Sequence, residues 1–144
     1  MRLSSRDTHY DLPLDRIFLG VSRACRATRG VVMALARFPS PKQMNFASIG
    51  NVEARVCGSQ ERVPFVVRRG FLGSGTPHVV VQDFEWEPEW TLILHTDGLR
   101  TSWQWTDFPG LGHEPAKVVA LKLLRALATD NDDATVLAVK CVAL

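Results

Sequence analysis

Short apolar runs follow one another closely after residue 30, and this spacing limits the fold more than any other feature of the chain. Proline and serine breakers end the run VVMALARF, which we expect to be a strand buried on both faces. The pair Gly50 and Asn51 then predicts a tight structural bend between the next two runs, MNFASI and VEARVCG. Parallel strands need crossovers of about a dozen residues or more, so these runs predict an antiparallel meander.

The same β pattern continues toward the carboxyl end. The glycine-rich segment RRGFLGSGTP joins two further predicted strands, VPFVV and HVVVQDFEW. The run TLILHT follows, and ATVLAVKCVAL predicts the last strand of the chain.

Two segments have helical periodicity instead. AKVVALKLLRALA carries an apolar stripe, with Pro115 at an allowed first position. The segment before Gly30 is a second amphipathic helix, for which Asp11 or Asp15 is the expected cap and Gly30 the expected stop. LRTSWQW, after Gly98, could form a short third helix. The helix before Gly30 presents these apolar-face residues: Ile17, Phe18, Val21, Ala24, Cys25 and Thr28.

Strands in hairpin succession with helices at both ends predict an α+β fold. We expect a layered antiparallel β-sandwich flanked by helices on at least one face. The length of 144 residues suits a single domain, and 46% hydrophobic with 22% charged residues is an ordinary globular composition.

Charge and cysteine content narrow the classes of partner and compartment. The net charge of +2 is too small to imply nucleic acid or a membrane surface, and no apolar run is long enough to cross a bilayer. Cys25, Cys57 and Cys141 lie far apart and show no C-x-x-C spacing, so neither a disulfide framework nor a zinc site is indicated. We expect reduced thiols and a cytoplasmic protein.

Three candidate features each have a plainer structural interpretation. The glycines beside Arg68 and Arg69 could cradle a phosphate, but the strand predicted after them favours a structural turn. His95 is more typical of a hydrogen-bonded strand-end histidine than of a ligand. The tryptophans could form a stacking surface, although packing in the core is the commoner role; they are Trp86, Trp90, Trp103 and Trp105.

Carboxylates flank two of the predicted strands. Asp97 directly follows the run LILHT, and Asp130, Asp132 and Asp133 directly precede the last strand. If those strands are neighbours, the carboxylates meet at one edge of the sheet, where hard oxygen ligands without cysteine suit Mg²⁺ or Mn²⁺. Alternatively, Asp97 and Gly98 form only a turn, and the later aspartates only a solvated cap.

Four segments in order carry a resemblance to a known family. They are TRGVVMALARF, FASIGNVEARV, LILHTDGL and DDATVLAVK, and an FPGL loop follows the aspartate and glycine of the third. Over residues 14–142 the chain resembles the metal-dependent PPM-type protein serine/threonine phosphatases. Within them it is most similar to the bacterial SpoIIE-type branch, to RsbX-like phosphatases and to related domains of bacterial stress-signalling modules.

The resemblance implies an α-β-β-α sandwich with two Mn²⁺ or Mg²⁺ ions, where a metal-activated water attacks phosphoserine or phosphothreonine. By motif match, Asp97 and Asp132 take the places of metal-binding aspartates. Gly98 supports the site through its backbone, and Gly50 with Asn51 matches a structural bend. No catalytic side chain is assigned beyond these metal ligands.

The chain departs from the family pattern at its amino end. No segment before Asp11 matches the upstream aspartate-glycine motif whose carboxylate bridges both metals. We therefore expect residues 1–13 to be a leader or truncated start and 14–144 to be the carboxyl-terminal portion of the phosphatase domain. Exposed sheet edges would then favour self-association.

Two functions remain open on this basis. One is a phosphatase acting on a phosphorylated signalling protein, such as an anti-sigma antagonist, in stress or sigma-factor partner switching. The other is a catalytically inactive module that binds such a partner without hydrolysing it.

Overall fold

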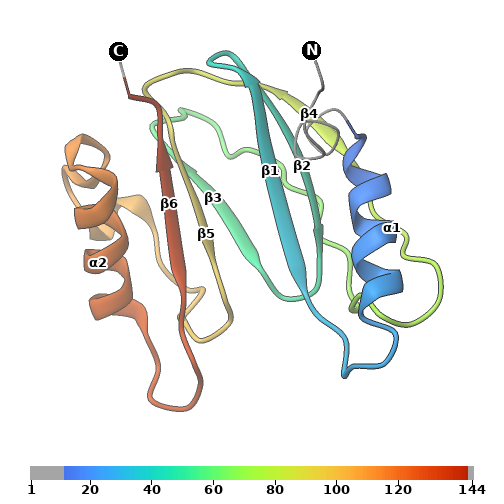
Figure 1. Cartoon of the computed structure of the whole chain (residues 1–144). Helices are drawn as coiled ribbons and strands as arrows, with labels where there is room; N and C mark the ends of the chain where they lie inside the picture. The colour runs from blue at the N-terminus through green and yellow to red at the C-terminus, as the bar shows by residue number, and fades with distance from the viewer. Residues whose placement is uncertain (1–11, 143–144) are drawn as a thin grey trace, which may run out of the picture.

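The chain folds into four layers, with two antiparallel sheets stacked face to face and one helix on each outer face (Figure 1). This computed structural model describes residues 12–142. The α+β sandwich expected from the sequence is confirmed. The elements are α1 (Leu14–Ala24), β1 (Met33–Ser40), β2 (Gln43–Ile49), β3 (Glu53–Cys57), β4 (Gln82–Glu85), β5 (Thr91–His95), the 3-10 turns η2 (Trp105–Asp107) and η3 (Leu111–His113), α2 (Ala116–Leu127) and β6 (Val136–Lys140).

The strands are divided between two sheets of three strands each. The first sheet has the order β1-β2-β4, and the second has the order β3-β5-β6. All four pairings are antiparallel. The bend at Gly50 therefore carries the chain from one sheet to the other, and β5 is the central strand of the second sheet.

Three apolar clusters hold the four layers together. One lies between the sheets and includes Met44, Phe46 and Leu92. A second joins α1 to the first sheet around Phe18 and Leu72, and a third lies under α2. Alternate residues of β5 belong to different clusters, because successive side chains of a strand point to opposite faces. Leu92 and Leu94 lie between the sheets, and Ile93 lies under α2. The cluster under α2 contains Ile93, Leu99, Trp103, Leu111, Val119, Leu123 and Leu127.

The carboxyl-terminal helix α2 begins directly after Pro115, as its sequence predicts. Helix α1 differs from expectation at both ends. It ends at Ala24 rather than near Gly30, so Cys25 and Thr28 lie beyond it, and Pro13 occupies the capping position instead of Asp15. Asp11, the other expected cap, lies outside the described residues.

Several local predictions between the strands were wrong. Residues 63–67 form no strand, because the side-chain amide of Gln82 takes the place of a β ladder: it accepts from the Val66 amide and donates to the Pro64 carbonyl. The strand predicted over residues 78–86 shortens to Gln82–Glu85, and the expected helix after Gly98 is absent apart from the turn Trp105–Asp107.

Strand β1 is also less buried than its apolar sequence suggests. It lies at one edge of its sheet, and its residues are partly buried rather than covered on both faces. Two of the four tryptophans, Trp86 and Trp103, are buried in the core. This agrees with the expectation that the tryptophans mainly pack in the core.

Two observations bear on the thiols and on the membrane. Cys25, Cys57 and Cys141 are free, and burial raises the pKa of the Cys57 thiol although the nearby Lys140 cation opposes that shift. Among residues 12–142, no helix combines the length and apolar character that a membrane span requires.

A candidate metal site at one edge of the sandwich

The ends of three strands meet at one edge of the second sheet. In the pairing register, His95 at the end of β5 lies opposite Glu53 at the start of β3 and opposite Val136 at the start of β6. Asp97 lies two residues beyond β5, and Asp132 precedes β6. Antiparallel pairing thus brings the loops that carry both aspartates to the same end of the sheet.

Backbone contacts join these two loops directly. The Thr96 amide donates to the Thr135 carbonyl at 3.1 Å, and the Thr135 amide donates to the Thr96 hydroxyl at 3.0 Å. Gly98 is buried, and its carbonyl accepts from the Thr129 amide at 2.9 Å. The loops are therefore held together by a network that does not use the aspartate side chains.

Gly98 is needed here because of close approach and not because of a left-handed backbone. A Cβ atom at this position would lie 2.1 Å from the carbonyl oxygen of Asp133, far inside contact distance. Any larger residue would push the two loops apart. The sequence-based expectation that Gly98 supports the site through its backbone remains a prediction, with this contact as its physical basis.

Asn51 reaches the same edge from the start of the second sheet. Its side-chain amide donates to the Asp97 carboxylate at 2.5 Å, so one oxygen of that carboxylate already has a partner. Sequence reasoning treated Asn51 only as part of a bend and missed this bond. The bend itself depends on Gly50, which has φ 99°, and whose added Cβ would lie 2.2 Å from the Val32 side chain.

We call the group formed by Asn51, Asp97 and Asp132 the aspartate edge. All three residues are exposed. One oxygen of the Asp132 carboxylate accepts from the amide of Asp133 at 2.8 Å. Asp130 and Asp133 are exposed in the same loop.

The chemistry of these donors fits a hard divalent cation. Carboxylate oxygens are preferred by Mg²⁺ and Mn²⁺, and Mg²⁺ commonly binds through one or two carboxylates while keeping waters and substrate oxygens. Within residues 12–142, no three or more His, Cys, Asp and Glu side chains are grouped so as to hold a metal ion. A cation here would therefore depend on ligands besides the two aspartates.

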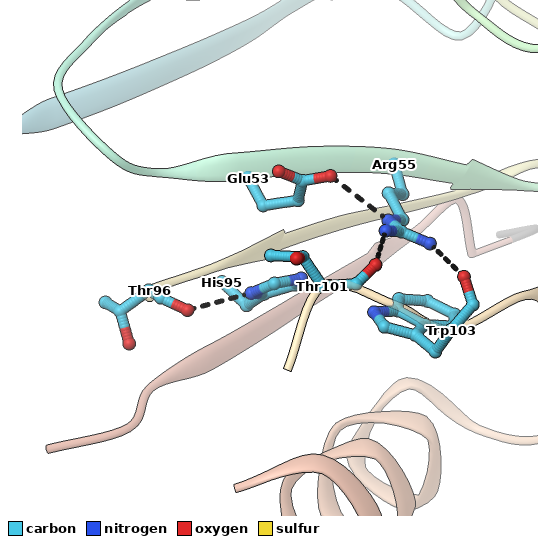
Figure 2. Close-up of polar contacts among 6 residues, drawn as sticks. All are labelled: Glu53, Arg55, His95, Thr96, Thr101 and Trp103. Atoms are coloured by element: carbon cyan, nitrogen blue, oxygen red, sulfur yellow. Dashed lines mark hydrogen bonds and ion pairs between the residues drawn. The ribbon is translucent and has the colours of Figure 1, made fainter. Parts of the chain in front are cut away.

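His95 lies just before the aspartate edge but points into the α2 side of the sheet. It is 2% exposed, its Nδ1 is 2.9 Å from the Thr96 carbonyl oxygen, and its ring lies 6.4 Å from that of Trp103 (Figure 2). Its buried Nε2 has no hydrogen-bond partner. The histidine is a packed strand-end residue, in line with the plainer interpretation of the sequence.

The Arg55 side chain holds the segment that follows Asp97, and we call its two hydrogen bonds to this segment the arginine fork. From β3, Arg55 donates to the carbonyls of Thr101 and Trp103 at 2.5 and 2.6 Å, and its guanidinium carbon lies 4.2 Å from the centroid of the Trp103 ring (Figure 2). Glu53 pairs with the same guanidinium at 3.3 Å. Sequence reasoning missed this contact, because nothing local in VEARVCG indicates what Arg55 faces.

Comparison with known proteins gives a fold and no more. No family model and no curated protein matches the chain at a significant level. A solved chain of the bacterial stressosome, described as a modular system adapted to control secondary messenger signaling, matches with TM-score 0.79 and 21% identity, over 94% of this chain and 72% of that one.

Two further solved structures share the same architecture. RsbX in complex with magnesium matches with TM-score 0.69 and 18% identity, over 92% of this chain and 66% of RsbX. The phosphatase domain of SpoIIE from Bacillus subtilis, presoaked with manganese, matches with TM-score 0.56 and 15% identity, over all of this chain and 75% of that domain. The chain thus has the fold of PPM-type phosphatase domains, which the sequence resemblance had implied.

Proposed function

We propose that this chain works as a metal-dependent protein serine/threonine phosphatase domain of the SpoIIE and RsbX type. Its substrate is a phosphoserine or phosphothreonine of a bacterial signalling protein, in stress or sigma-factor partner switching. The observation that carries the proposal is the joining of the Asp97 and Asp132 loops at one exposed edge, with Asn51 bonded to Asp97. The shared fold with RsbX and SpoIIE supports it.

In this proposal Asp97 and Asp132 would hold Mn²⁺ or Mg²⁺ through their carboxylate oxygens. Such an ion supplies charge stabilisation for phosphoryl oxygens and lowers the pKa of water. Asn51 holds one oxygen of Asp97 and so limits the rotation of the carboxylate, and Gly98 keeps the two loops in contact. The exposed position of the edge admits a phosphorylated side chain that is still part of a protein.

A second candidate function is a partner-binding module with this fold and without catalysis. This candidate is supported by the small number of metal ligands, because residues 12–142 bring no three Asp, Glu, His or Cys side chains together at one point. The similarity to a chain of the stressosome is compatible with such a role. The module would bind a phosphorylated protein and leave its phosphate in place.

Mn²⁺ binding and Mn²⁺-dependent hydrolysis of a phosphoserine peptide, measured in parallel, test the two functions. The phosphatase proposal expects turnover that is lost in Asp97→Asn and in Asp132→Asn, together with weaker Mn²⁺ binding by electron paramagnetic resonance. Asp15→Asn, which removes an exposed carboxylate from α1, is the matched control and should change neither quantity.

The outcomes separate the candidates. Mn²⁺ binding that depends on both aspartates but brings no phosphate release favours the non-catalytic module. Mn²⁺ binding that is equal in the wild type and in both edge variants would remove the basis for a metal site at the aspartate edge.

A further inference from the structure

The segment from Val67 to Gly73 is fastened beside the aspartate edge. The Gly50 amide donates to the Arg68 carbonyl at 2.8 Å, and Ile49 and Arg68 form a parallel bridge. Four residues later, Leu72 exchanges two backbone hydrogen bonds with Val31, at 2.7 and 3.0 Å, and its side chain is fully buried. The residues between these anchors therefore form a short projection with fixed ends.

This projection presents two cations and an aromatic ring to solvent. Arg68 and Arg69 are exposed, and neither guanidinium has a hydrogen-bond or ion-pair partner within the part of the chain that the structure describes. Phe71 is 50% exposed, although burial is the usual position for a phenylalanine. Unpaired arginines are well suited to carboxylate and phosphate groups, which they bind through two parallel hydrogen bonds.

The projection and the aspartate edge are connected through two residues. Arg68 is bonded to Gly50, the next residue is Asn51, and the Asn51 side chain is bonded to Asp97. Carboxylates and free guanidinium groups thus lie on segments that are joined by hydrogen bonds, and together they are complementary to a phosphorylated segment. The carboxylates are suited to bind a cation that also binds the phosphate. The arginines are suited to bind the phosphate oxygens or acidic side chains next to the phosphorylated residue.

We propose that Arg68, Arg69 and Phe71 form a recognition surface for a phosphorylated segment of a partner protein. This inference rests on the proposed function, because it names the class of ligand that enters the same edge. Phe71 favours a peptide over free phosphate, since a half-exposed ring two residues after Arg69 can pack against an apolar side chain of a peptide. The glycine-rich loop is thus a binding element held by the sandwich as well as a turn.

Peptide binding without metal tests this surface independently of catalysis. The probe is a fluorescein-labelled nonapeptide of alanine and leucine with one central phosphoserine, and its binding to the full chain is measured by fluorescence anisotropy in EDTA. We expect Arg68→Gln/Arg69→Gln to weaken binding about tenfold, in line with the loss of charge-assisted hydrogen bonds. Phe71→Ser should weaken binding of the same peptide to a smaller degree.

The matched control is Arg16→Gln/Lys117→Gln, which lowers the net charge equally. Both residues are exposed, and each lies in the first turn of its helix. The final turn of α2 leads to the Asp132 loop, and the final turn of α1 leads to the connection with β1 at the same end of the molecule (Figure 1). The first turns of both helices lie at the opposite end (Figure 1). This variant should bind the phosphopeptide like the wild type.

Three results would overturn the inference. The first is equal binding by the Arg68 and Arg69 variant and the control. The second is equal binding of the unphosphorylated peptide, and the third is full competition by an equal concentration of inorganic phosphate. None of them bears on Mn²⁺ binding by Asp97 and Asp132, so failure of this inference and failure of the proposed function are separate outcomes.

Discussion

Asn51 and Asp97 form a hydrogen-bonded pair at the exposed end of the second sheet, and this contact is the most informative one at the scale of single residues. An exposed hydrogen bond of this kind adds little to folding stability, because water offers a competing partner. It can nevertheless fix the orientation of a carboxylate that holds a cation. Partners of this type commonly change metal affinity by about 10- to 100-fold.

Asn51→Ala should weaken Mn²⁺ binding about tenfold while leaving the thermal midpoint nearly unchanged. Isothermal titration calorimetry and a thermal melt in EDTA measure the two quantities. The chain offers a matched control in Asn45, whose side-chain amide bonds Asp83 across β2 and β4 in the first sheet. Asn45→Ala should not alter Mn²⁺ affinity, and an equal loss in both variants would exclude a specific role for Asn51.

At the scale of elements, the segment between β5 and α2 depends on long cationic side chains from the sheet. Arg55 of β3 binds the carbonyls of Thr101 and Trp103, and Lys140 of β6 binds those of Gly112 and Glu114. The segment has little regular structure apart from two 3-10 turns. Its position over the second sheet therefore relies on these side chains and on the burial of Trp103 and Leu111.

Arg55→Ala should lower the free energy of unfolding by about 2 to 4 kcal/mol, through loss of charge-assisted hydrogen bonds and of the contact with Trp103. Urea denaturation followed by tryptophan fluorescence measures this loss. Arg62→Ala is the control, because Arg62 is exposed and makes no hydrogen bond or ion pair within residues 12–142. A similar effect in both variants would mean that the fork does not stabilise the segment.

A groove of about 890 Å³ runs between this segment and the strand β3 with the loop after it. Arg55 forms part of its wall, so the arginine fork also shapes this surface. The lining is mixed in charge, with Glu61, Arg62 and Asp107 among its residues. This composition does not select one class of ligand.

At the scale of the whole molecule, the sheets end in strands that have one unpaired side among the described residues. Strands β3 and β6 are the two edges of the second sheet. On β6, Leu137 is 53% exposed although its register partner Leu94 is buried between the sheets. Unpaired edges with apolar side chains are a known route to association between copies of a chain.

We expect the chain to be oligomeric or poorly soluble on its own, and Leu137→Lys should shift it toward monomer because a charge on an edge strand opposes pairing. Size-exclusion chromatography with light scattering measures the molar mass. Leu121→Lys changes an exposed leucine on α2 and should have no such effect. A wild-type chain that elutes as a sharp monomer peak would contradict the expectation.

Much of the fold could be predicted because it depends on local patterns. The stripe of α2 after Pro115 and the apolar runs of β2, β3 and β5 are read from neighbouring residues, and short connections require antiparallel pairing. The common position of the Asp97 and Asp132 loops followed from one assumption, that their strands are adjacent. Their role as metal ligands remains a prediction from family resemblance.

The remaining features were decided by contacts between distant parts of the chain. Residues 63–67 have a strand-like sequence, yet the side chain of Gln82 occupies the positions that a neighbouring strand would need. The sequence by itself determined the position of α2 and of the strands β2, β3 and β5, since these depend on periodicity within a few residues. Only the tertiary structure decided that Asn51 meets Asp97 and that Arg68 lies beside Gly50, because strand register and loop contacts arise from packing across the whole core.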